Sequence, residues 1–324
     1  DQKKYEEATP YFKHVLEVRR SRLGNENVLT LEARIDVAEL LWAQGQDERD
    51  WDKFDEALAL FRDILDVRRR IYGNMHHRTL THIKGLARRI DVLDIDEEAA
   101  LELYIESLEG YRSVGGDDDA RVLDLLEEIA DHLFDDLKRY DEAELYLEEL
   151  IPLQRRTLGN DHSDTLDSIT LMSRTLYRQK KYDEAEPYYV ERLSLSRRLH
   201  GNDDPVTLSA MNMMGRLLRN QGKYDEAMPY YTEALETRLR TLGDEHPKTL
   251  WSINNMGWQF AIQGKYDEAM PYLAEALETR RRTLGDEHSD TLWSMSNMGW
   301  MLAIQGKYDE AMPYLAEALE TRRR

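Results

Sequence analysis

Near-identical copies of one segment follow each other at the end of the chain, and this repetition constrains the fold more than any other feature. The stretch from Thr249 to Arg282 recurs from Thr291 to Arg324 with four substitutions. Tyrosines at 182, 224, 266 and 308 extend the same period of 42 residues backwards. A fixed period of this length is typical of solenoids, in which each unit buries its apolar face against its neighbours. We therefore expect one repeated unit throughout the chain.

Each unit is predicted to contain two helices, called here helix A and helix B. Apolar or small residues recur at three- and four-residue spacing in helix A, as on one buried helix face: Leu250, Ile253, Met256, Gly257 and Phe260. Gly264 is expected to end helix A in the left-handed conformation. Helix B begins at Tyr266, with acids in its first turn and arginines in its last, as the helix dipole favours. Gly285 ends it, and a polar loop follows.

Seven positions of this unit resemble the tetratricopeptide repeat: Gly257, Phe260, Gly264, Tyr266, Ala269, Leu273 and Ala276. The long helix B and its LGDEHPKTL connection look like the 42-residue variant found in kinesin light chains. The resemblance implies an all-α fold, a right-handed solenoid (superhelix) of about seven and a half antiparallel helix pairs. It also implies that the A helices line a concave surface.

The domain prediction is a single array over residues 1–324. It consists of helix B of a cut repeat at 1–24 and of repeats at about 28–73, 78–115, 119–159, 163–201, 205–243, 247–285 and 289–324. An insertion at 46–52, which contains Trp51, is expected to enlarge a turn or to extend a helix. The pattern weakens in an irregular region, 94–137, where we expect two ordinary helices with altered loops. Both ends have the pattern of a chain cut from a longer protein, and a missing or disordered cap would give the same pattern.

Composition excludes several kinds of function. The formal charge of −20 disfavours nucleic-acid binding, which depends on basic side chains. The absence of cysteine excludes disulfides and thiolate metal sites. The sequence has no apolar run long enough for a membrane span and no signal-peptide pattern, so we expect no membrane association and a cytoplasmic location.

No catalytic site, cofactor or metal is predicted. His162, His246 and His288 recur once per unit at the same edge, which predicts loop or capping roles because they do not converge on one point. The sequence contains no GxSxG, HExxH, phosphate-loop or CxxC motif. The carboxylates of helix B alternate with arginines at four-residue spacing, as in surface ion pairs.

The candidate partner-binding residues lie on the helix A face beside the packing stripe: Asn212, Arg216, Trp251, Asn254, Trp258, Trp293, Asn297 and Trp300. Indoles are common interface anchors, and amides can bond a peptide backbone. The alternative is that neighbouring A helices bury the indoles against each other. The predicted function is a non-catalytic scaffold that binds a protein or peptide, either a basic segment or one with apolar anchors.

Two other functions fit the same repeats. The array could be the sensor or regulatory arm of a larger enzyme, a kinase, NTPase or caspase-like protease, with the catalytic module on the same or another chain. It could also be a self-assembling structural module whose terminal helices stack end to end. Light scattering and the full-length sequence would separate these alternatives.

Overall fold

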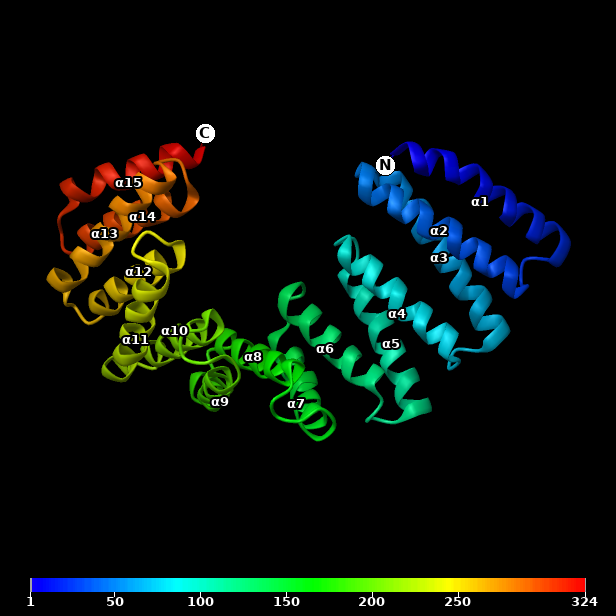
Figure 1. Ribbon diagram of the computed structural model, residues 1–324, viewed down its shortest axis with the longest axis horizontal. Helices are drawn as coiled ribbons and strands as arrows, with labels where there is room; N and C mark the ends of the chain where they lie inside the picture. Colours follow the sequence, from blue (N-terminus) through cyan, green and yellow to red (C-terminus); the bar gives the residue numbers. More distant parts are fainter. Residues whose placement is uncertain (1, 324) are drawn as a thin grey trace. The chain divides into compact units, whose positions relative to one another are not determined.

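A computed structural model describes residues 2–323, and over these residues it contains fifteen helices and no strand (Figure 1). The helices are α1 (Gln2–Leu23), α2 (Val28–Glu48), α3 (Trp51–Tyr72), α4 (His77–Val92), α5 (Glu97–Gly115), α6 (Ala120–Asp135), α7 (Tyr140–Thr157), α8 (Ser163–Arg178), α9 (Tyr182–His200), α10 (Pro205–Asn220), α11 (Tyr224–Leu242), α12 (Pro247–Ala261), α13 (Tyr266–Leu284), α14 (Ser289–Ile304) and α15 (Tyr308–Arg323). The fold is an all-α right-handed solenoid of helix pairs, which confirms the predicted class. Even-numbered helices are A helices and odd-numbered helices are B helices.

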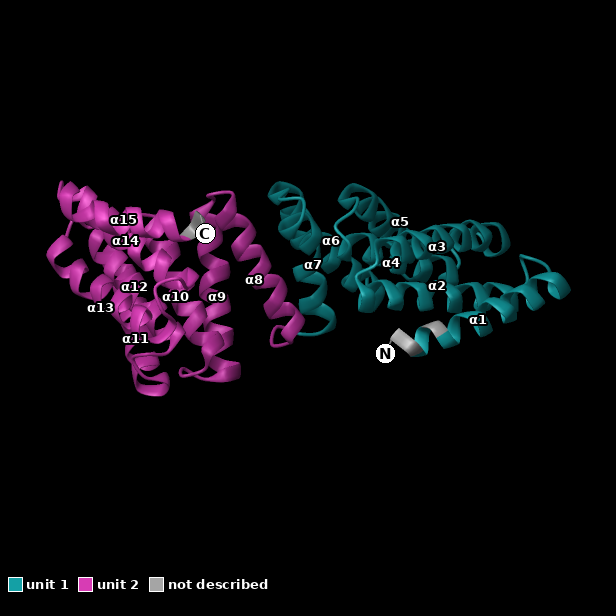
Figure 2. Ribbon diagram, turned by 90° about the horizontal axis from the view of Figure 1, so that it is seen from above, with its two compact units in different colours: residues 1–159 teal, residues 160–324 magenta. Residues whose placement is uncertain are grey.

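The chain forms two compact units, Asp1–Gly159 and Asn160–Arg324 (Figure 2). Unit 1 contains α1 to α7, and unit 2 contains α8 to α15. The single array over 1–324 stays a prediction, and residues 1 and 324, at which its first and last repeats end, lie outside the described residues. None of the helices over residues 2–323 combines enough length with enough apolar character to span a lipid bilayer.

Recurring polar residues begin the A helices. His162 Nδ1 accepts a hydrogen bond from the backbone N–H of Asp164, and His246 and His288 do the same two residues before their own partners, at 3.1 Å in both cases. Each histidine therefore satisfies one of the free N–H groups at a helix start. The predicted capping role of the three histidines is confirmed.

Glycines serve two separate purposes in the repeat. Gly264 follows α12 with φ +75°, a left-handed conformation that side chains other than glycine rarely adopt. Gly257 lies inside α12, where a Cβ atom would come within 2.9 Å of Leu273 in α13. The first glycine allows the turn, and the second allows helices A and B to approach closely.

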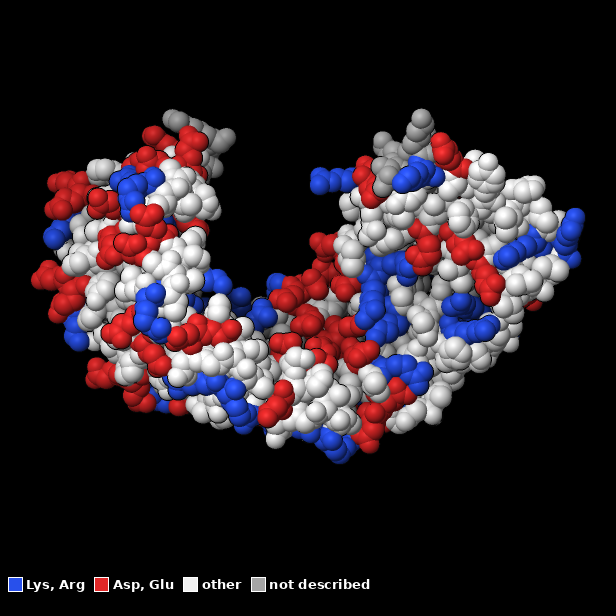
Figure 3. Space-filling view, in the orientation of Figure 1, with Lys and Arg blue, Asp and Glu red and all other residues white. Residues whose placement is uncertain are grey.

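Side-chain contacts arrange the A helices and the B helices of each unit as two layers. Between B helices, one ion pair recurs at the same place: Arg69 with Glu106, Arg112 with Glu149, Arg197 with Glu233 and Arg281 with Glu317. Between A helices α4 and α6, Lys84 Nζ lies 3.2 Å from Glu128. Figure 3 shows basic side chains gathered over α4 and acidic ones over α6. Charges thus link neighbouring helices within each layer.

The two interruptions of the repeat are helical. The insertion at 46–52 lengthens both helices beside it, because α2 has 21 residues where α8 has 16, and α3 has 22 where α9 has 19. Trp51, the first residue of α3, is 59% exposed. Its ring meets that of Phe54 edge-on, with centroids 5.9 Å apart. The irregular region forms α5 and α6, which confirms the two expected helices, and Asp119 replaces histidine as the residue that caps α6.

Candidate functional site

Four tryptophans lie on α12 and α14 of unit 2, and we call Trp251, Trp258, Trp293 and Trp300 the tryptophan face. Trp300 is 58% exposed, Trp251 38% and Trp293 37%, whereas Trp258 is half-buried. Large side chains of this kind are usually covered in a soluble protein. Three indoles are therefore open to solvent on two successive A helices.

The fourth indole belongs partly to the core. Trp258 packs against the buried cluster formed by α12 to α15, and its ring centroid lies 6.3 Å from that of Trp300, at an interplanar angle of 49°. For the pair Trp258 and Trp300, this contact agrees with the alternative that neighbouring A helices pack their indoles against each other. Trp300 remains the exposed member of the pair.

The candidate asparagines are buried, which corrects their expected place on the surface. Asn212 and Asn254 are each 1% exposed, and Asn297 is 8% exposed. Asn212 Nδ2 donates to the Leu208 carbonyl at 2.8 Å, and Asn297 Nδ2 donates to Asn254 Oδ1 at 3.1 Å. Because a buried amide must find partners inside the protein, Asn254 and Asn297 bond to each other between α12 and α14, and Asn212 bonds within α10.

Arg216 lies in α10, outside the tryptophan face. It is half-buried, and its guanidinium carbon lies 4.8 Å from the ring centroid of Tyr177. A cation over an aromatic face is attracted by the ring quadrupole. Arg216 therefore has a packing role on α10, and the structure does not bring it together with the four indoles.

Two pockets flank Trp251 at the start of successive A helices. One, of about 380 Å³, has Ser209, Arg238 and Lys248 in its wall. The other, of about 490 Å³, has Arg280, Asp290 and Trp293. Trp251 lines both pockets, so its indole lies between them.

Arg238 and Arg280 line these pockets, and the sequence analysis did not identify them as candidate site residues. Each is 3% exposed, and each donates to a serine hydroxyl of the following A helix, Ser252 and Ser294 respectively. Burial lowers the pKa of both guanidinium groups, and nearby Asp290 acts in the opposite sense on Arg280. Their carbon Cζ lies 5.9 and 5.4 Å from the rings of Trp251 and Trp293.

The signal that could have found them is positional. Arg238 and Arg280 both stand 14 residues after the tyrosine that starts helix B, and Arg68 stands 14 residues after Phe54. Arg238 and Arg280 belong to B helices and lie close to the rings of Trp251 and Trp293. Residues of helix B therefore surround the tryptophan face together with those of helix A.

A second polar cluster lies in unit 1. His132 in α6 is 2% exposed, its Nε2 donates to the Glu97 carbonyl at 2.8 Å, and its Nδ1 lies 2.8 Å from Asp91 and 3.3 Å from Asp136. Burial lowers the pKa of His132, but the bonds to Asp91 and Glu97 and the charges of Asp91 and Asp136 outweigh it and raise the pKa to about 9.

Donor atoms of Asp91, His132 and Asp136 lie within 4.8 Å of one another, close enough to hold a metal ion. At neutral pH the protonated imidazole already supplies the positive charge between the two carboxylates. The cluster is therefore an internal ion pair, and the prediction that the protein has no metal or cofactor stays a prediction.

Known family models match the repeated helix pairs of this chain. A family model described as tetratricopeptide repeat matches residues 121–198, 170–240, 206–278 and 259–324, which together span more than half of the chain. The chain belongs to the tetratricopeptide repeat family. A second model with the same description matches residues 1–28 and 52–78, and neither model describes a catalytic family.

Solved structures of the same fold include several repeat proteins. BtubC (BKLC) from P. vanneervenii is similar with a TM-score of 0.56 and 20% identity, over 70% of this chain and 91% of that one. A putative kinesin light chain from Podosopora anserina, with nearly identical TPR-like repeats, has a TM-score of 0.54 and 22% identity, over 62% and 94%. The apo form of the quorum sensor NprR from B. thuringiensis has a TM-score of 0.56 and 14% identity, over 99% and 83%. At these identities the likeness concerns the fold. No curated protein matches the chain.

Proposed function

We propose that this tetratricopeptide repeat protein is a non-catalytic scaffold and that its tryptophan face binds a segment of a partner protein. The observation that carries the proposal is the exposure of Trp251, Trp293 and Trp300 on successive A helices beside two pockets. Exposed indoles on a rigid support give large apolar contact for little loss of conformational entropy.

The pockets indicate the chemistry of the bound segment. Each combines an indole with a buried arginine, and the second also contains Asp290. A segment with apolar anchors would place them against the indoles, and its polar groups would bond to the pocket rims. We favour the apolar-anchored segment over a basic one, because Arg238 and Lys248 repel a basic side chain at the first pocket.

An affinity capture with matched variants tests the proposal. The immobilised full chain is compared with a Trp293→Ala/Trp300→Ala variant, and the captured proteins are identified by mass spectrometry. Trp51→Ala is the control, because this indole is equally exposed but lies in unit 1. A partner captured by the wild type and the control but not by the double variant supports the proposal.

The same partner is then measured in purified form. Loss of two anchor residues is expected to weaken binding by at least about tenfold, since interface tryptophans often contribute more than about 1 kcal/mol each. Trp258 is left intact because its removal would disturb the core of α12 to α15. Equal affinity of the wild type and the double variant would contradict the proposal.

Self-association is a second candidate, favoured by one observation. The last described helix, α15, exposes Tyr308 by 67%, Met312 by 61% and Leu319 by 51%. Exposed apolar side chains on one helix are typical of surfaces that pair with another protein surface. A molar mass by light scattering that stays monomeric at all concentrations would exclude this candidate.

A further inference from the structure

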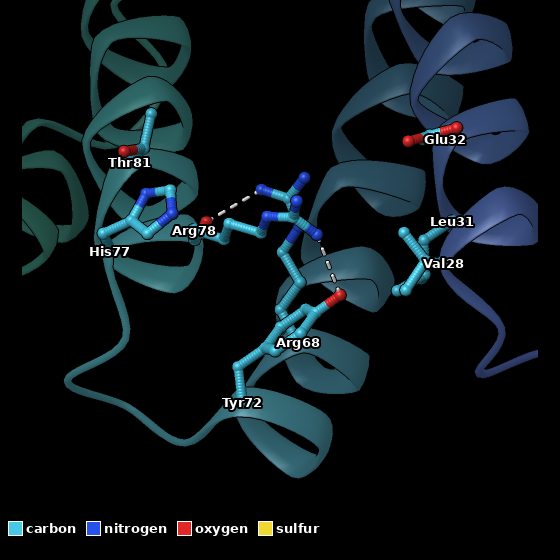
Figure 4. Close-up of a pocket in the computed structure, with 8 residues that line it drawn as sticks. All are labelled: Val28, Leu31, Glu32, Arg68, Tyr72, His77, Arg78 and Thr81. Carbon is cyan, nitrogen blue, oxygen red and sulfur yellow. Dashed lines mark hydrogen bonds between the residues drawn. The ribbon is translucent and has the colours of Figure 1, made fainter.

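A pocket of about 300 Å³ lies in unit 1 between α2, α3 and α4, at the place in the repeat that the two tryptophan-lined pockets occupy in unit 2 (Figure 4). No tryptophan lines it. Its polar wall consists of Arg68 and Tyr72 from α3, His77, Arg78 and Thr81 from α4, and Glu32 from α2 on the opposite side. The pocket is thus mainly cationic.

The two guanidinium groups lie close together and neither pairs with a carboxylate among the described residues. Arg68 Nη1 donates to the backbone carbonyl of Arg78 at 2.9 Å, and Arg78 Nη1 donates to the Tyr72 hydroxyl at 3.2 Å (Figure 4). A guanidinium has five N–H donors, so most of them remain for a ligand or for water.

The positive charges also disfavour each other. Burial lowers the pKa of Arg68, the Tyr72 hydroxyl acts in the opposite sense, and the charge of Arg78 lowers it further. Two like charges held in one hollow are stabilised by an anion placed between them. Glu32 faces the pocket without closing it, as an exposed side chain on the far wall.

The equivalent pocket of α13 and α14 shows what neutralises such a site. Arg280 takes the place of Arg68, since both stand 14 residues after the aromatic residue near the start of helix B, and Asp290 takes the place of Arg78. The pocket of α13 and α14 thus supplies its own carboxylate, whereas the pocket of α3 and α4 supplies a second cation, as the pocket of α11 and α12 does with Lys248. The charge of this pocket therefore differs from one copy of the repeat to another.

We propose that the pocket of Arg68 and Arg78 binds a phosphate-type oxyanion, either inorganic phosphate or a phosphate monoester. The tetrahedral oxygens of phosphate can accept bonds from two guanidinium groups at once, which a point cation such as lysine matches less well. The Tyr72 and Thr81 hydroxyls add two further polar groups to the wall. This site is independent of the tryptophan face.

Calorimetric titration of the full chain with inorganic phosphate, at constant ionic strength, tests the proposal. Arg78→Gln should weaken phosphate binding by at least about tenfold, because a bond to a charged group is lost. Glu32→Gln should tighten it severalfold, because the only acid of the pocket becomes neutral. A folding defect cannot produce this gain, so the second variant keeps the test decisive.

Arg282→Gln is the matched control, since it removes one positive charge from an exposed arginine in unit 2 that pairs with Glu245. It should leave the affinity unchanged. Titration with O-phosphoserine then distinguishes the two sources: tighter binding than inorganic phosphate indicates a monoester, and weaker binding indicates the free ion. No saturable binding to the wild type, equal binding to Arg78→Gln, or equally tight binding of acetate would overturn the proposal.

Discussion

The helix pairs α5–α6 and α11–α12 place different residues at the same point of the repeat. In α12 the buried Gln259 donates from Nε2 to the carbonyl of Tyr224, the first residue of α11, at 2.8 Å. In α6 the residue at this point is His132, which donates from Nε2 to the carbonyl of Glu97, the first residue of α5. The irregular region makes the same bond as the α11–α12 pair, but with a titratable side chain.

The two pairs differ at the second ring nitrogen of His132, Nδ1, which has no counterpart in Gln259. His132 Nδ1 pairs with Asp91, whose other carboxylate oxygen accepts from the Tyr104 hydroxyl at 3.0 Å. The regular pair has a neutral amide at this point. A histidine in place of the glutamine thus keeps the bond to helix B while it adds a charge, and the charge makes stability depend on pH.

The largest expected effect on stability follows replacement of His132 or Gln259 by leucine. His132→Leu removes the cation from a buried ion pair and should cost the α5–α6 region about 3–5 kcal/mol. Gln259→Leu leaves one buried carbonyl unsatisfied and should cost α11–α12 about 1–3 kcal/mol. Hydrogen exchange followed by mass spectrometry reads the two regions separately in one chain. Equal losses of protection in the two regions would contradict the assignment of a charged pair to α5–α6 and a neutral bond to α11–α12.

The second effect is the pH dependence of unit 1. The pKa of His132 is raised to about 9, so its contribution is complete below the ordinary histidine pKa of about 6.5 and is lost as pH rises through 9. The loss should reach about 3 kcal/mol. His132→Gln, which copies Gln259, should keep the Glu97 bond and abolish this alkaline loss, as measured by hydrogen exchange of α6 between these two pH values. An unchanged pH profile in the variant would contradict the account.

His82 in α4 gives the opposite slope on the acid side. Its Nε2 lies 2.7 Å from the Phe61 carbonyl. Burial lowers its pKa to about 4, helped by the charges of Arg68 and Arg89 and opposed by the Phe61 carbonyl bond. Its contribution is therefore present above the unfolded pKa of about 6.5 and is lost as pH falls towards 4. Unit 1 should be most stable near pH 6.5, and a maximum displaced to pH 9 would contradict the two assignments together.

A smaller effect concerns the close approach of helices A and B. Gly257 in α12 corresponds to Ala130 in α6. A Cβ atom added at Gly257 would come within 2.9 Å of Leu273, whereas Ala130 already has a Cβ atom at the same point of the repeat. Gly257→Ala should therefore destabilise α12–α13 by about 1–3 kcal/mol despite the better helix propensity of alanine. Ala130→Gly should cost about 1 kcal/mol. Chemical denaturation of each variant checks the values, and a stabilising Gly257→Ala would show that the approach is not tight.

The smallest effect should come from the ion pairs between B helices. Arg112 and Arg281 stand at the same point of the repeat, and each pairs with a glutamate of the following B helix. Because both pairs are partly exposed, Arg112→Gln and Arg281→Gln should each cost less than about 1 kcal/mol. Salt titration of the denaturation midpoint checks this, since a larger, salt-insensitive loss would mean that the pairs are effectively buried.

Periodicity predicted the fold because each element depends on its neighbours in sequence. Tyr266 starts α13, Leu284 ends it, and Gly264 turns the chain as expected. The insertion at 46–52 left two outcomes open, because residue spacing alone does not separate an enlarged turn from the longer α2 and α3. The local pattern thus predicted the helices and left the lengths of these two undecided.

The candidate site was predicted in part. Exposure of Trp293 and Trp300 follows from their place beside the packing stripe, but the burial of Asn254 and Asn297 comes from a bond between two A helices. His132 was not recognised because its partner Asp91 lies 41 residues earlier in the chain. Contacts between successive repeats are the part of the structure that helix periodicity does not encode.

Photo-crosslinking can show whether the tryptophan face contacts a partner protein. A photoreactive phenylalanine analogue is placed in turn at Trp293 and Trp300, and at Trp51 as the exposed control in unit 1. The account predicts that the same partner protein crosslinks from positions 293 and 300 and not from position 51. Crosslinks from position 51 alone, or from none of the three positions with a partner that still binds, would contradict it.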